Sequence, residues 1–174
     1  MILRCTARLL SVVKAPTEVT PADPNPEDWY GNLVWIDRRK CLLVTHSQTL
    51  LSVFAADVRT ADLRPLGSFV VPLIEGALEA EGLSPHTFGR LDPHDVRLAK
   101  TADRSVLGCM NDMVFTIQHA IHLDGGLERS DIALINRQLR RSISSSRGYA
   151  RPIDMARAWL TRDRGSCPSS NSCP

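Results

Sequence analysis

Residues 32–55 read NLVWIDRRKCLLVTHSQTLLSVFA, and this stretch decides the fold class. It holds three short runs rich in apolar and β-branched residues, which are separated by charged or polar residues at 37–40 and 47–48. Runs of this length with turn-like breaks are typical of an antiparallel meander. Because the runs are more continuously apolar than strict alternation would give, we expect helices to cover both faces of the sheet.

Outside the meander, the pattern predicts two more short strands, at residues 1–5 and 95–101, and several helices. Good N-cap residues open three of the helices, at Thr6, Asp103 and Ser130. Proline is tolerated in a first helical turn and disruptive later, so Pro72 and Pro152 should lie near helix starts. The five expected helices cover residues 6–13, 72–82, 103–124, 130–143 and 152–160. The sequence therefore predicts an α+β fold, a small antiparallel meander sheet of about four to five strands packed with about five helices that cluster in the C-terminal half.

The chain has 174 residues, which suits one domain over residues 1–160 followed by a disordered tail at 161–174. No apolar run approaches the roughly 18 residues that cross a bilayer. Arg4, Arg8 and Lys14 interrupt the mildly apolar start, which argues against a signal peptide and favours a cytoplasmic protein. Five cysteines without a CxxC spacing argue against a disulfide framework or a zinc site, and we expect no metal or cofactor.

The segment KTADRS at residues 100–105 places cations where the third of these helices would begin. A helix N-terminus carries partial positive charge and unpaired N–H groups, so acids are favoured there and cations are not. An anion held between Lys100 and Arg104 would explain them, with Thr101 and Ser105 as hydroxyl donors. The alternative is that Arg104 pairs with an acid and Lys100 points to water.

A second group of cations, Arg38, Arg39 and Lys40, forms the turn of the expected hairpin. Such a tip can contact the phosphates of nucleic acid, or it can simply keep the sheet edge soluble. From residue 126 onward the chain has nine arginines against four acids. Some of these arginines form a candidate accessory patch on the expected helix 130–143: Arg137, Arg140 and Arg141.

Polar residues near the apolar stripe of the third helix need partners if they are buried. We expect Asn111 and Asp112, together with Asn32, to form a structural polar network. His119 and His122 are three apart on the same helix, but a pair without a third ligand is weak evidence for a metal.

Four stretches resemble a bacterial and archaeal family of unknown function: MILRCTARLL, DWYGNLVWIDRRKCLLVTH, ADLRPLG and KTADRSVLGCMNDM. Similar domains occur ahead of plasmid pRiA4b ORF-3-like domains, which are associated with mobile elements. The resemblance covers roughly residues 1–150 and implies no established activity. It places one set of residues in the recurring motifs of the family: Asn32, Arg38, Arg39, Lys40, Lys100, Thr101, Arg104, Ser105 and Asn111.

The leading hypothesis from the sequence is a small binding module for an anionic ligand, either nucleic acid or a phosphate group. It requires the 38–40 turn and the helix start at Lys100 and Arg104 to share one surface. One alternative is an enzyme that acts on a phosphorylated substrate, with Asp112 or His46 as the proton carrier. Another is a protein-interaction component of a two-gene module.

Overall fold

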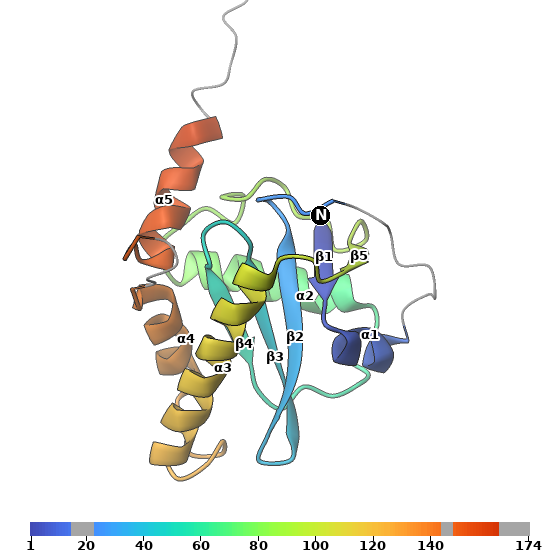
Figure 1. Cartoon of the computed structure of the whole chain (residues 1–174), viewed down its shortest axis with the longest axis vertical. Coiled ribbons are helices and arrows are strands. Elements are labelled where there is room, and N and C mark those ends of the chain that lie inside the picture. The colour runs from blue at the N-terminus through green and yellow to red at the C-terminus, as the bar shows by residue number, and fades with distance from the viewer. Residues whose placement is uncertain (15–22, 144–147, 164–174) are drawn as a thin grey trace, which may run out of the picture.

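The computed structural model describes residues 1–14, 23–143 and 148–163, and it has one mixed sheet flanked by helices (Figure 1). The strands are β1 (Ile2–Cys5), β2 (Trp29–Ile36), β3 (Arg39–His46), β4 (Ser52–Ala55) and β5 (Arg97–Lys100). Their order in the sheet is β4-β3-β2-β1-β5. The expected meander is confirmed, since β2, β3 and β4 pair antiparallel, whereas β1 pairs parallel with both β2 and β5.

The helices are α1 (Ala7–Val13), α2 (Leu66–Glu79), α3 (Arg104–Leu123), α4 (Ile132–Arg141) and α5 (Pro152–Asp163). The α+β class and the clustering of α3, α4 and α5 in the C-terminal half are confirmed. Helix α5 continues to Asp163, three residues into the expected tail, and the rest of that tail lies outside the described residues. None of the described helices is long and apolar enough to cross a membrane.

Each face of the sheet carries its own hydrophobic core. Successive residues of β3 alternate between them: Leu42 packs in the cluster that includes Val70 and Ile74 of α2, and Leu43 packs with Met110 of α3. Burial of both faces explains why the strands are apolar at almost every position. Strand β4 forms one edge of the sheet. The candidate site lies where this edge strand meets α2 and α4.

Two expected helix starts were wrong. Helix α2 begins at Leu66, and Pro72 lies inside it on an exposed position. Proline removes one backbone hydrogen bond, but the buried side of this helix, including Val70 and Ile74, holds it against the core. Helix α4 is capped by Asp131, whose carboxylate accepts from the backbone N–H of Leu134 at 3.0 Å, and not by the preceding serine.

Candidate functional site

The cations of the 38–40 turn and those of the helix start lie at opposite ends of α3 (Figure 1). The turn contacts the loop after α3, because Asp37 accepts a hydrogen bond from the backbone N–H of Leu127 at 2.7 Å. Lys100 and Arg104 lie where α3 begins. A helix of 20 residues is about 30 Å long, so the two groups do not share one surface.

Arg38, Arg39 and Lys40 also differ in their surroundings. Arg39 forms ion pairs with Asp57 at 2.8 Å and with Glu128, so internal carboxylates already balance its charge. Arg38 is exposed and adopts the left-handed conformation of a tight hairpin turn, with φ of 63°. Lys40 is half-buried. The turn is therefore a docked hairpin tip rather than a cluster of free cations.

The helix start already holds a negative group of its own. The carboxylate of Asp103 caps α3 and accepts from the backbone N–H groups of Ser105 at 2.7 Å and Val106 at 3.3 Å. Lys100 and Arg104 are exposed and form no ion pair with the residues that the structure describes. Ser105 is exposed and Thr101 half-buried, and anion binding by these side chains stays a prediction.

The expected polar network does not form within the described residues. Asn32 is half-buried on β2, whereas Asn111 and Asp112 are exposed on α3, and no side-chain hydrogen bond joins the three. Of the two alternative proton carriers, Asp112 is exposed on α3 and His46 is fully buried among the rings of Trp29, Phe88 and Trp159. Burial lowers the pKa of His46 to about 3.

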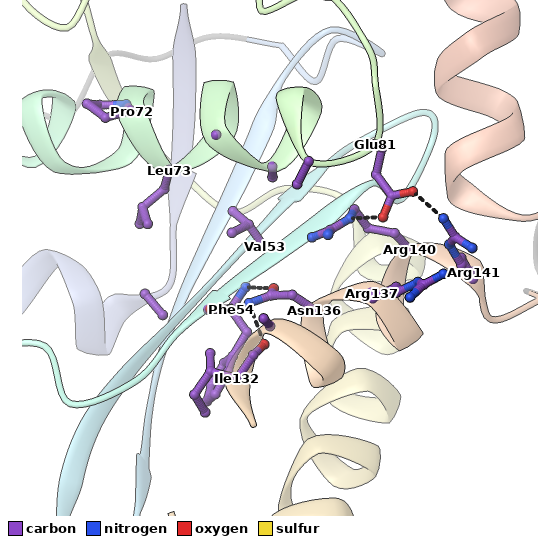
Figure 2. Close-up of a pocket in the computed structure, with 15 residues that line it drawn as sticks. Val53, Phe54, Pro72, Leu73, Glu81, Ile132, Asn136, Arg137, Arg140 and Arg141 are labelled. Atoms are coloured by element: carbon purple, nitrogen blue, oxygen red, sulfur yellow. Dashed lines mark hydrogen bonds and ion pairs between the residues drawn. The ribbon is translucent and has the colours of Figure 1, made fainter. Parts of the chain in front are cut away.

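A cavity of about 690 Å³ lies between α2, α4 and the edge strand β4 (Figure 2). Its floor is formed by Val53, Phe54 and Ala55 of β4. From α2 and the turn that follows it come Pro72, Leu73, Gly76, Ala77, Ala80 and Glu81. The opposite wall, from α4, consists of Ile132, Ala133, Asn136, Arg137, Arg140 and Arg141. The volume falls in the range of about 300 to 1,000 Å³ that is usual for small-molecule sites.

Small residues keep the space between the two helices open. Gly76 and Ala77 face it from α2, Ala80 faces it from the C-cap of that helix, and Ala133 faces it from α4. A Cβ atom placed on Gly76 would meet no other atom within 4 Å. A larger side chain at position 76 can therefore extend into the cavity, because its Cβ atom would not clash with any neighbour.

Asn136 closes the free edge of the sheet at the floor of the cavity. Its side-chain oxygen accepts from the backbone N–H of Phe54 at 2.7 Å, and its nitrogen donates to the Phe54 carbonyl oxygen at 2.8 Å. The same nitrogen donates to the carbonyl oxygen of Ile132 at 3.0 Å. The amide thus replaces a neighbouring strand, and both of its N–H donors are in use.

One end of the cavity is charged and partly buried. The carboxylate of Glu81 accepts from Nε of Arg140 at 3.1 Å and from a terminal nitrogen of Arg141 at 2.9 Å. Burial by itself would raise the pKa of Glu81, but the hydrogen bonds from Arg141 and Arg140 outweigh it and the pKa is lowered. Glu81 is therefore ionised at neutral pH.

Arg140 is unusual because it is buried, yet most of its donors have no partner among the residues that the structure describes. Only 5% of the residue is exposed, although the sequence placed it in a surface patch. Its Nε atom bonds Glu81, while its two terminal nitrogens form no hydrogen bond with the described part of the chain. Figure 2 shows the tip of its guanidinium turned into the cavity toward Val53.

Sequence reasoning found the three arginines only as an accessory patch and missed Glu81. A signal for Glu81 did exist, since it follows the end of α2, where the helix dipole disfavours an acid. An acid at such a position often has a cationic partner, but the sequence does not say that the partner lies 59 residues away.

As for metals, no three His, Cys, Asp or Glu side chains gather as a binding site in the described ranges.

Comparison with known proteins places the chain in one family. Residues 2–155 match the family model described as "Domain of unknown function (DUF6933)". No match is found among curated proteins or among solved structures. Because the match covers most of its length, the chain belongs to this family.

Proposed function

We propose that this member of the DUF6933 family is a binding module for an anionic ligand, and that the ligand's negative group binds Arg140 in the cavity between α2 and α4. The proposal keeps the class of ligand expected from the sequence. It moves the site away from the 38–40 turn and the start of α3, because those two groups of cations are separated by the length of α3.

The burial of Arg140 carries the proposal. A guanidinium has five N–H donors, and the bond from Nε to Glu81 uses one of them. The two terminal nitrogens face the cavity, where an anion can accept from both of them. Because the residue is only 5% exposed, a charge-assisted hydrogen bond at this position is shielded from bulk water and is stronger than a bond to water.

The charge balance of the cavity also favours an anion. Among the lining residues, Arg137, Arg140 and Arg141 face one carboxylate, that of Glu81, which leaves a formal charge of +2. The C-terminal ends of α2 and α4 lie at this end, and each contributes roughly −0.5 of an elementary charge. The remaining charge is about +1, so the cavity attracts an anion even after the helix dipoles are counted.

The same residues support binding rather than catalysis. Within the described ranges Glu81 is the only acid that lines the cavity, and its two arginine partners keep it ionised. A general acid or base works best with a pKa near the working pH, which Glu81 lacks. The enzyme hypothesis names Asp112 or His46 as the proton carrier, and neither lines the cavity.

An amphipathic dye tests this proposal directly. We expect 8-anilinonaphthalene-1-sulfonate to bind the folded protein with increased fluorescence, and N-phenyl-1-naphthylamine, which lacks the sulfonate, to bind at least tenfold more weakly. Gly76→Leu should fill the cavity and abolish dye binding. Gly108→Leu is the matched control, because Gly108 is also an exposed helical glycine whose added Cβ would meet nothing within 4 Å.

Dye binding that survives in Gly76→Leu would place the dye on another apolar surface and contradict the proposal. So would equal binding of the neutral dye, because the charge of Arg140 would then play no part. Far-ultraviolet circular dichroism of both leucine variants would confirm that each retains the helical content of the unmodified protein.

A further inference from the structure

The chemistry of the cavity narrows the ligand further, and this inference rests on the proposed function. We infer that the ligand is an amphipathic carboxylate: a single carboxylate group on the terminal nitrogens of Arg140, and an unbranched or aromatic apolar body that lies along Gly76 and Ala77 toward Leu73.

The two terminal nitrogens of Arg140 are placed to bind the two oxygens of one carboxylate group. Its Nε edge is occupied by Glu81, so the end of the guanidinium presents the two terminal nitrogens side by side. A planar fork of this kind binds a carboxylate through two parallel hydrogen bonds. One carboxylate would therefore use the part of Arg140 that has no partner in the described part of the chain.

The charge of the site fits one negative charge better than two. Near neutral pH a phosphate monoester carries a charge of about −1.5 to −2. The end of the cavity that holds the three arginines and Glu81 has a net charge of only about +1 after the helix dipoles are counted. Glu81 lies next to Arg140 and would repel a second charge. Phosphate sites also use helix N-termini and hydroxyl groups, and here two helices end and no serine, threonine, tyrosine or lysine is among the lining residues.

Beyond the end that holds the three arginines and Glu81, the described lining residues offer a ligand no free polar side chain. The amide of Asn136 already bonds the backbone of Phe54 and Ile132 through its oxygen and its nitrogen. The other side chains that face the space are apolar, among them Val53 and Leu73. A ligand body with hydroxyl or amide groups would lose hydrogen bonds to water here, so the body should be hydrocarbon.

The dimensions set the approximate length of that body. The lining residues of α2 and the turn that follows it run from Pro72 to Glu81, and those of α4 run from Ile132 to Arg141 with the same spacing. Nine residues of helix span about 14 Å, which is enough for a chain or ring system of moderate size. An extended peptide is excluded as a strand partner, because Asn136 already occupies the edge of β4 at Phe54.

Calorimetric titration of the full chain with five matched probes tests this inference. The probes are octanoate, octyl phosphate, octylammonium, octanol and acetate, each below its micelle concentration. We expect octanoate to bind most tightly, octyl phosphate and octanol at least tenfold more weakly, and octylammonium and acetate not measurably. Octanoate binding should be lost in Gly76→Leu, be retained in Gly108→Leu, and weaken about two- to fivefold in Arg137→Gln, which removes an exposed charge at the rim.

The outcomes separate the two proposals. If octyl phosphate binds as tightly as octanoate and is lost in Gly76→Leu, the carboxylate assignment is overturned while the anion-binding function stands. If octanol binds as tightly as octanoate, or if octanoate binds Gly76→Leu unchanged, both are overturned. If no probe binds while the sulfonate dye still requires Gly76, the inference fails and the proposed function survives on the dye result.

Discussion

Replacing Glu81 by glutamine removes one negative charge from the cavity and keeps the shape of the side chain. In the folded protein the side chains of Glu81 and Arg140 are 2% and 6% exposed, so the substitution leaves a buried guanidinium without its counter-charge. Removing one partner of a buried pair costs about 3 to 5 kcal/mol. The glutamine oxygen can still accept one hydrogen bond and the cavity admits water, so we expect a loss of about 2 to 3 kcal/mol.

The same substitution should strengthen the binding of an anion. It raises the formal charge of the lining residues by one unit, and a partly screened charge at short range is worth on the order of 1 kcal/mol. Octanoate affinity should therefore rise about fivefold although the protein is less stable. A purely structural role for Glu81 would lower stability without this gain in affinity.

Urea denaturation, followed by circular dichroism with and without octanoate, measures both effects. Arg141→Gln is the control, because Arg141 is 47% exposed and its bond to Glu81 should contribute less than about 1 kcal/mol. A Glu81→Gln protein within about 0.5 kcal/mol of the original would refute the account of a buried ion pair. Unchanged octanoate affinity would refute the electrostatic part.

The pH dependence of the pair has a definite sign. The pKa of Glu81 is lowered in the folded state, so the unfolded chain takes up the proton first as the pH falls. The stability from this group is present above its ordinary pKa of 4.5 and is lost as the pH falls through the lower folded value. Glu81→Gln should reduce the loss of stability in that acidic range.

Three further predictions concern packing, the sheet edge and a buried histidine. Gly67→Ala should lower the free energy of unfolding in urea by about 1 to 3 kcal/mol or more, because its Cβ would lie 2.2 Å from a backbone carbonyl oxygen. Gly76→Ala in the same helix should raise it by up to about 1 kcal/mol. Asn136→Leu should lower the free energy of unfolding by about 2 kcal/mol, because the backbone N–H and carbonyl of Phe54 lose their partner. Gel filtration of this variant should show association of the protein through the opened edge of the sheet. His46 has a pKa of about 3 in the folded protein and an ordinary pKa of 6.5, so the free energy of unfolding should fall as the pH is lowered from 6.5 toward 3. Urea unfolding at pH 7 and pH 5 should show a smaller decrease of this free energy in His46→Phe than in the unmodified protein.

The part of the fold that local signals determine could be predicted from the sequence. Residues 32–55 form the meander because each turn joins neighbouring runs, so the pairing needs no distant information. The parallel pairing of β1 with β2 and β5 was not predicted, since parallel partners are joined by long connections without a turn signature. The start of α2 was missed because tertiary packing tolerates Pro72 inside the helix.

The candidate site was harder to predict than the fold. Lys100 and Arg104 were recognised from their position at a helix start, but their distance from the 38–40 turn depends on how that turn docks after α3. Helical spacing correctly placed Leu139 inward and gave no reason to bury its neighbour Arg140. That burial depends on Glu81, which lies in the turn after α2, in a distant part of the chain.

A crystal structure of the protein grown with octanoate tests the central claim most directly. The account predicts a carboxylate group in hydrogen-bond contact with both terminal nitrogens of Arg140, with the alkyl chain over Gly76. An octanoate molecule bound elsewhere, or a closed cavity in which those nitrogens donate to carbonyl oxygens of the protein, would contradict it.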